Sequence, residues 1–103
     1  MVNKNYVKGA TFERKIKDKY ERQGYLVIRS AGSHSVADLI AIPPKNIIGL
    51  KPILIQCKVT SQKTSHRLIK EMLPLRKTAI KYDCEAVLVV KLKKRIEYNH
   101  IVT

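Results

Sequence analysis

Cysteine and histidine are scarce in this sequence, and their scarcity excludes two kinds of site. The two cysteines, Cys57 and Cys84, cannot form a disulfide framework and lack the Cys-x-x-Cys spacing of a metal clip. We therefore expect both to be buried, reduced thiols. The histidines His34, His66 and His100 are scattered without the spacing of zinc ligands, and we expect them at the surface.

Long apolar runs and acidic residues are also lacking. No run approaches the roughly 20 consecutive apolar residues of a membrane span, and residues 1–5 lack the apolar core of a signal peptide. We therefore expect a cytoplasmic protein without a membrane partner. Only 8 Asp and Glu oppose 21 Lys and Arg, which gives a net charge of +13. Such an excess destabilises a folded domain unless a polyanion neutralises it, so nucleic acid is the first candidate partner.

What the chain does contain is enough for one compact domain. Its 103 residues, 45% of them hydrophobic, support a modest core and argue against a second domain. We expect residues 1–103 to form a single domain, with residues 1–8 as a flexible basic arm. The order of apolar patterns indicates an α/β fold with a central mixed five-stranded sheet flanked by helices. The helices are expected at 9–23 and 70–82, and the strands at 25–28, 36–42, 53–59, 85–90 and 95–101.

The central feature is a pair of apolar strands that carry three polar residues. Asp38 lies in the first of these strands, and Gln56 and Lys58 lie in the second. Because side chains alternate between the two faces of a strand, Gln56 and Lys58 share one face. The other face is filled by the core residues Ile53, Ile55, Cys57 and Val59. If the two strands are neighbours, a carboxylate, a carboxamide and an ammonium group converge on one spot.

Such a group of side chains suits metal-dependent hydrolysis of phosphodiesters. A divalent ion held by oxygen ligands activates a water and stabilises transition-state charge, and magnesium needs few protein ligands. Asp38, the side-chain oxygen of Gln56 and the main-chain carbonyl of Cys57 are candidate metal ligands. Lys58 would position the attacking water or stabilise developing charge. Together with the basic composition, this pattern favours a nuclease.

Two polar segments flank this spot in the sequence. The glycine-containing run at 29–35 is predicted to be a loop over the same site, and the basic run at 61–67 a mobile loop on the substrate side. Glu13 lies at the edge of the apolar stripe of the first helix. From spacing alone, it is a surface residue paired with Lys17.

Four stretches of the chain together carry a family resemblance. They are Lys8-Gly9-Ala10 with Glu13-Arg14, the run 24–33 with its Arg-Ser-Ala-Gly-Ser string, Asp38, and Gln56-x-Lys58-Val59-Thr60. Over nearly its whole length the chain resembles archaeal-type Holliday junction resolvases of the restriction-endonuclease-like superfamily. The resemblance implies a homodimer that binds four-way or other branched DNA. It also implies that the dimer cuts two opposed strands symmetrically with magnesium, for which manganese can substitute.

The residue patterns and the resemblance together assign roles to individual residues. The catalytic candidates are Glu13, Arg29, Ser30, Ser33, Asp38, Gln56 and Lys58. The metal-binding candidates are Glu13, Asp38, Gln56 and the Cys57 carbonyl. The DNA-binding candidates are Lys4, Lys8, Arg14, Arg29, Lys63 and Arg67. The candidates for the dimer interface are Met72, Leu75, Thr78, Ala79 and Tyr82.

One position departs from the family pattern and leaves the activity open. Gln56 stands where the family has Glu, so the site loses an anion and should bind metal more weakly, unless Glu13 supplies the missing charge. The alternative is therefore a catalytically weak or inactive junction-binding module of the same fold. A basic RNA-binding protein explains the charge alone, and the spread of basic residues along the chain disfavours a membrane-surface role. Resolvases of this kind also occur in archaeal viruses, for which the host-cell cytoplasm would be the place of action.

Overall fold

The computed structural model describes residues 4–30, 35–45 and 48–103 of the chain. One five-stranded sheet has the strand order β1-β2-β3-β4-β5. Strands β3 and β4 pair in parallel, and the other neighbours pair antiparallel, so the sheet is mixed as predicted. The elements are α1 (Lys4–Arg22), β1 (Leu26–Arg29), β2 (Leu39–Ile42), β3 (Ile53–Val59), α2 (His66–Lys70), α3 (Leu73–Lys81), β4 (Glu85–Lys91) and β5 (Ile96–Ile101).

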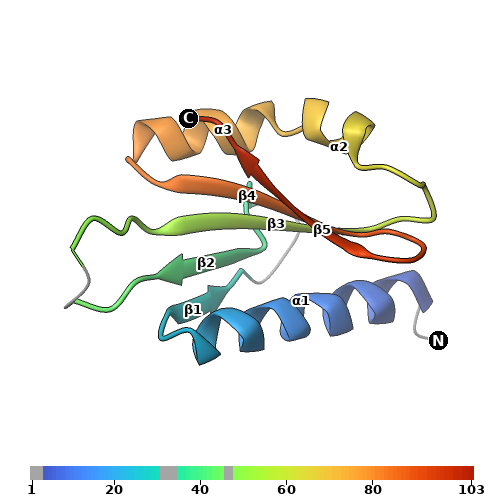
Figure 1. The fold of residues 1–103 in the computed structure, drawn as a ribbon, viewed down its shortest axis with the longest axis horizontal. Helices are drawn as coiled ribbons and strands as arrows, with labels where there is room; N and C mark the ends of the chain where they lie inside the picture. The colour runs from blue at the N-terminus through green and yellow to red at the C-terminus, as the bar shows by residue number, and fades with distance from the viewer. Residues whose placement is uncertain (1–3, 31–34, 46–47) are drawn as a thin grey trace.

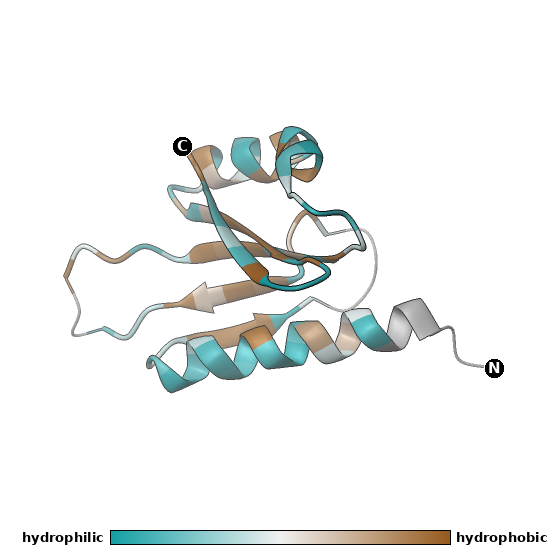
Figure 2. Cartoon of the chain, turned by 45° about the vertical axis from the view of Figure 1, so that its right-hand side comes forward, coloured by the Kyte–Doolittle hydropathy of each residue, from teal (hydrophilic) through white to brown (hydrophobic). Residues whose placement is uncertain are grey.

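Helices cover both faces of the sheet. Figure 1 shows α1 on one side of the strands, with α2 and α3 on the opposite side. Helix α1 contacts β1, β2 and β3, whereas α3 contacts β3 and β4. Figure 2 shows hydrophobic residues along the central strands and hydrophilic residues over most of α1. This distribution is the one expected of a surface helix that buries a single apolar stripe.

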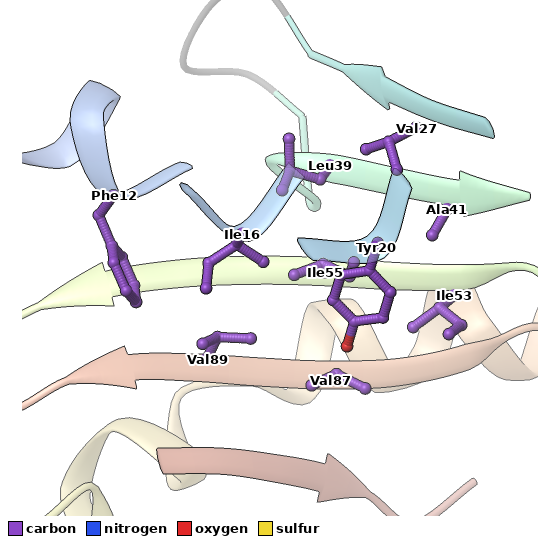
Figure 3. Packing of buried hydrophobic residues seen from close by; sticks show 10 residues of the cluster. All are labelled: Phe12, Ile16, Tyr20, Val27, Leu39, Ala41, Ile53, Ile55, Val87 and Val89. Carbon is purple, nitrogen blue, oxygen red and sulfur yellow. The ribbon is translucent and has the colours of Figure 1, made fainter. Parts of the chain in front are cut away.

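The first core cluster lies between α1 and the sheet. Phe12, Ile16 and Tyr20 recur at helical spacing and are 3%, 1% and 8% exposed. They pack on side chains from β1 to β4, as Figure 3 shows. Burial of each large apolar side chain stabilises the fold by roughly 1.5–3 kcal/mol. The cluster therefore fixes α1 on the sheet and, with it, the direction in which the other side chains of this helix point.

The second core cluster lies on the opposite face, under α3. Helix α3 packs there through Leu75 and Ala79, and Leu54 of β3 joins the same cluster. Because Leu54 lies on the same face of β3 as Gln56 and Lys58, this face is apolar at the start of the strand and polar only near its end. The prediction of a single core face is therefore incomplete, since β3 is buried on both faces in its first half.

Two helical segments differ from the prediction. Helix α1 begins at Lys4 and runs through Gly9, so the backbone from Lys4 to Lys8 is helical and is not a flexible arm. A single glycine inside a helix costs only about 1 kcal/mol, which the remaining turns offset. The helix expected at 70–82 is observed as α3, which begins at Leu73 with Pro74 in its first turn, where a missing N–H is tolerated. The short helix α2 was not predicted, and most of it lies outside the expected range. No helix in the described ranges is long and apolar enough to cross a membrane.

Candidate functional site

Asp38 ties three strands together at one end of the sheet. It lies in a bend, so β2 begins at Leu39 and not at Val36 as predicted. Its N–H donates to the Ile55 carbonyl at 2.8 Å, and its carbonyl accepts from the Ser30 N–H at 2.9 Å. Strand β3 and the residue that follows β1 therefore hold the backbone of Asp38 from both sides.

The side chain of Asp38 reaches the Gln-x-Lys segment of β3. Its Oδ2 accepts a hydrogen bond at 2.8 Å from the backbone N–H of Cys57, which is 19 positions away in the sequence. Cys57 stands between Gln56 and Lys58, and all three residues are half-buried. The two segments that the sequence pattern singled out are therefore direct neighbours.

Glu13 of α1 is directed toward the end of β1. Its Oε1 lies 3.6 Å from Nε of Arg29, and its side chain is 19% exposed. The pairing with Lys17 that spacing alone suggested is wrong, because Lys17 bonds to Glu21 at 2.8 Å. The sequence could not reveal the partnership with Arg29, since it depends on how the buried stripe of α1 seats the helix on the sheet.

Asp38 is close enough to Glu13 to change its ionisation. Burial raises the pKa of Glu13 above its ordinary value, the Asp38 carboxylate raises this pKa further, and the Arg29 guanidinium opposes both effects. Burial also raises the pKa of the Cys57 thiol, with further contributions from Asp38 and Glu13. The thiol therefore stays protonated at neutral pH, and the two carboxylates act on one common space.

The oxygen donors of this space fit a divalent cation that needs few protein ligands. Across residues 4–30, 35–45 and 48–103, no three His, Cys, Asp or Glu side chains form a group that could hold a metal ion. Two carboxylates are nevertheless present, and Arg29 does not cancel the effects of burial and of Asp38 that raise the pKa of Glu13. Magnesium binds through one or two carboxylates, with waters and substrate phosphates completing its octahedron. A site with two carboxylates suits this ion.

The main-chain carbonyl of Cys57 offers a further oxygen. The N–H and C=O groups of one strand residue point to the same side, and the N–H of Cys57 points to Asp38. Register between β2 and β3 ends where Leu39 meets Ile55, so the carbonyl lies beyond the paired residues. Gln56, which precedes Cys57 in β3, offers the neutral oxygen of its side-chain amide.

The remaining candidates lie around this site or outside the described atoms. Ser30 is half-buried and contacts Asp38 through its backbone, as above. Ser33 and His34 lie outside the described residues, and Lys4 is described by its backbone alone. The exposed basic candidates for DNA contact are Lys8, Arg14, Arg29, Lys63 and Arg67.

Sequence reasoning missed two features beside the site. Lys8 of α1 and the residues Val59, Thr60 and Ser61 line an open hollow of about 530 Å³ at the end of β3. Lys8 was a DNA-binding candidate, and Thr60 belongs to one of the motifs that carry the family resemblance. The hollow that they share was missed, because nothing local in the sequence places α1 next to the end of β3.

The second missed feature is an anchor for the segment that follows β3. Ser65 is 4% exposed, and its Oγ donates to Oε1 of Glu97 at 2.7 Å across 32 positions of sequence. This bond holds the pKa of Glu97 below its ordinary value, with Arg95 acting in the same direction. The segment at 61–67, predicted to be mobile, is therefore attached to β5 at Ser65, and α2 begins directly after it.

The helix predicted to form a dimer packs mostly against the core of its own protomer. Met72, Leu75 and Ala79 are 8%, 2% and 0% exposed and belong to the second core cluster, so they are not surface residues. Thr78 is half-buried, and Tyr82 is 64% exposed. The exposed apolar residues along α2, α3 and the end of α3 are Ile69, Leu73, Ile80 and Tyr82.

The fold and the site define a class of protein. A mixed sheet with helices on both faces and an aspartate fixed to a Gln-x-Lys strand is a restriction-endonuclease-like architecture. The structure is similar to that of Hjc from Archaeoglobus fulgidus, a Holliday junction resolvase, with a TM-score of 0.64 and 22% identity. The superposition covers 91% of this chain and 73% of that one. The predicted fold class is confirmed.

The chain belongs to the archaeal Holliday junction resolvase (Hjc) family, whose sequence model matches residues 4–102. The crossover junction endodeoxyribonuclease Hjc of Methanocaldococcus jannaschii is 44% identical to it over 66 residues. That alignment covers 64% of this chain and 44% of the relative, so the match spans less than half of the relative's length. The family that the sequence motifs indicated is therefore confirmed.

Replacing Glu13 with Gln should stabilise the metal-free protein near neutral pH. Because the folded-state pKa of Glu13 is raised, ionisation of this residue opposes folding. This destabilisation of the folded state is absent well below the ordinary pKa of 4.5. It grows as the pH rises toward the folded-state pKa and is constant above that pKa. Urea unfolding in chelator should therefore show Glu13→Gln to be more stable than wild type at about pH 7 but equal to it at about pH 3.

Glu21→Gln is the matched control for this measurement. Glu21 pairs with Lys17 at the exposed surface of the same helix, so its loss should change the free energy of unfolding by no more than about 0.5 kcal/mol. Equal stability of Glu13→Gln and wild type at both pH values would contradict the electrostatic cost assigned to Glu13.

Proposed function

We propose that this protein is a structure-selective, metal-dependent endonuclease that resolves four-way DNA junctions by paired, symmetric strand cuts. The observation that carries the proposal is the 2.8 Å hydrogen bond from the Cys57 N–H to Oδ2 of Asp38, which fixes a carboxylate to the middle of the Gln-x-Lys segment. Membership of the Hjc family and the name of its relative, a crossover junction endodeoxyribonuclease, support the reaction. A net charge of +13 suits a polyanionic substrate.

Each residue of the site has a proposed role in the hydrolysis. Glu13 and Asp38 would hold a divalent cation, with the Cys57 carbonyl and the Gln56 amide oxygen as neutral ligands. When bound, the cation, magnesium or manganese in its place, supplies Lewis acidity and lowers the pKa of a bound water. Asp38 needs little reorganisation, because the Cys57 N–H already orients its carboxylate. Lys58 orients the attacking water or offsets the charge that develops on the phosphate.

Arg29 is proposed to exchange Glu13 for a phosphate oxygen. Its Nε lies 3.6 Å from Glu13 Oε1, which is longer than an ordinary hydrogen bond, and its side chain is 36% exposed. A cation held by Glu13 would offset the charge of this carboxylate, which would leave the guanidinium free to contact a phosphate with two parallel N–H groups. Ser30 and Ser33 of the adjoining loop are the proposed hydroxyl contacts to the same phosphate.

Basic side chains outside the site are proposed to supply most of the affinity. Lys8 and Arg14 on α1, with Lys4 at its start, and Lys63 and Arg67 after β3 would contact the phosphates of the junction arms. Such contacts are independent of sequence and dominate binding to nucleic acid. Binding should therefore survive the loss of catalytic residues. We place this activity in the cytoplasm, of a host cell if the chain is viral, without a membrane partner.

Paired cuts on opposed strands need two sites, and we propose a homodimer. Ile80 and Tyr82 at the end of α3 are 48% and 64% exposed, and Leu73 at its start is 50% exposed. A small domain gains stability by burying such side chains against a second copy. A further exposed pair, Leu26 and Ile28, lies on β1 at 62% and 48% exposure.

Tyr82→Asp should convert the dimer into monomers, because it would bury an uncompensated charge in the proposed interface. Sedimentation velocity at micromolar concentration measures this change directly. Ile28→Asp is the matched control, since it places the same charge on an exposed apolar residue of β1. A dimer that survives Tyr82→Asp but not Ile28→Asp would move the interface to β1, and a monomeric wild type would contradict the homodimer.

Asp38→Asn and Lys58→Ala should each lower metal-dependent cutting of a labelled four-way junction by about 100-fold or more, because each removes a group that acts on the reacting phosphate. Junction affinity should change by less than about threefold, since phosphate contacts supply it. Asp18→Asn, an exposed position of α1, is the control. Wild-type cutting rates in both site variants would show that the site is wrongly assigned.

Gln56→Glu separates the active enzyme from the weak or inactive alternative. A third carboxylate would add negative charge next to Asp38, so the variant should need about tenfold less magnesium for half-maximal cutting. If wild type does not cut and Gln56→Glu does, the protein is a junction-binding module whose site lost its metal affinity. An unchanged magnesium dependence would mean that Gln56 is not a ligand.

A further inference from the structure

A second basic concavity lies away from the carboxylates, at the turn between β4 and β5. Its volume is about 400 Å³. Its lining consists of Lys63, Leu92, Lys93, Lys94 and Arg95, and it is called the hairpin cleft below. The N–H of Leu92 donates to the Arg95 carbonyl at 2.8 Å and closes the turn. Four cationic side chains therefore gather around one buried leucine.

Arg95, which lines the hairpin cleft, is held in place by two acceptors. Its Nη2 donates to the Lys63 carbonyl at 3.3 Å and lies at the same distance from Oε2 of Glu97. The side chain nevertheless remains 58% exposed. A guanidinium oriented by two fixed acceptors loses little conformational entropy when it binds an anion through its other N–H groups.

A partly buried chain of polar side chains lies beside the hairpin cleft. The hydroxyl of Ser65 donates to Glu97, the residue that orients Arg95, and lies 3.4 Å from Oδ1 of Asn99. The amide of Asn99 in turn donates to the Leu88 carbonyl of β4 at 3.2 Å. These hydrogen bonds therefore link the segment that carries Lys63 to the strands that flank the turn.

The hairpin cleft lies at the same end of the sheet as the carboxylates. Strands β3 and β4 are parallel, so their last residues meet at one edge, where the Thr60 N–H donates to the Lys91 carbonyl at 3.0 Å. Figure 1 shows the β4–β5 turn, the end of β3 and the start of α1 at this end of the molecule. The hollow beside Lys8 lies at the end of β3 as well. A DNA backbone that runs from the Gln-x-Lys segment past the ends of β3 and β4 would therefore reach the basic residues of the hairpin cleft.

We propose that the hairpin cleft is a second phosphate site, which binds the DNA backbone of a junction arm at a distance from the phosphate that is cut. This inference rests on the proposed function. The site contributes affinity and the direction of the arm, and it takes no part in the chemistry. Lys93, Lys94 and Lys63 attract the backbone, and Arg95 gives one phosphate a directed contact.

The test replaces two lysines of the turn and compares a variant of equal charge. Lys93→Ser with Lys94→Ser removes two cations from the hairpin cleft. Lys45→Ser with Lys51→Ser removes two exposed cations from the connection between β2 and β3. Affinity for a four-way junction and for a linear duplex is measured between about 50 mM and 200 mM salt in chelator. Single-turnover cutting is measured at saturating enzyme with magnesium.

The hairpin variant should bind both DNAs about tenfold more weakly than wild type, with a salt slope smaller by about two, because two phosphate contacts are lost. Its single-turnover cutting rate should stay within twofold of wild type. The variant at Lys45 and Lys51 should keep the wild-type slope. Equal slopes in the two double variants would overturn the second phosphate site, and so would a loss of single-turnover cutting at full saturation.

Two further outcomes are distinguishable. A wild-type protein that binds DNA without cutting the junction contradicts the proposed enzyme, while the salt slope on linear duplex still decides whether the hairpin cleft binds its backbone.

Titration with inorganic phosphate, followed by the amide resonances of Lys93 and Arg95, provides a separate experiment. Shifts of these resonances combined with an unchanged DNA salt slope in the hairpin variant would assign the cleft to a free phosphate ion and overturn the DNA assignment.

Discussion

Three hydrogen bonds to Asp38 fix the geometry on which the site depends. The backbone of this residue is held by the Ile55 carbonyl and the Ser30 N–H, and its carboxylate is held by the Cys57 N–H. Two of these bonds join the bend before β2 to β3, and the third joins it to the residue that follows β1. A charged acceptor also makes the bond to Cys57 stronger than a neutral one would be. The carboxylate is therefore placed by the sheet itself, with no flexible loop between the fold and the chemistry.

The electrostatics of this site oppose folding, and the two cores offset that cost. Burial and the charge of Asp38 raise the pKa of Glu13, and Arg29 compensates for them only in part. Apolar clusters on both faces of β3 hold the strand in position despite this. A bound cation would remove this cost, which is why we propose metal affinity for a site that has only two carboxylates.

The sequence predicted the elements that depend on local pattern and missed those that depend on distant partners. Strand β3, with its alternation and its polar end, was predicted at its observed boundaries, and the mixed sheet followed from the order of patterns. Helical spacing alone missed the direction of Glu13, because it is set by the packing of α1, and only the family resemblance assigned this residue to the site. Ser65 was assigned to a mobile loop for the same reason, since its partner Glu97 is remote in sequence.

The helix proposed as a dimer contact illustrates a different limit. An apolar stripe on a helix predicts burial but does not say against what. Leu75 and Ala79 satisfy that pattern inside the protomer, and the exposed residues left for a partner, such as Ile80, lie beside the stripe. The role of Gln56 could not be predicted for another reason. The same side chain would be present whether it binds the metal as a neutral ligand or no longer binds it.

A crystal structure of the protein with manganese tests the central claim most directly, because the anomalous signal locates the ion without reference to activity. The geometry predicts one ion about 2.1 Å from a carboxylate oxygen of Asp38 and from the Cys57 carbonyl, with Glu13 contacting it directly or through water. An ion bound elsewhere, or an empty site at saturating manganese while Asp38 still accepts from the Cys57 N–H, would contradict the assignment of this site as a metal-dependent nuclease centre.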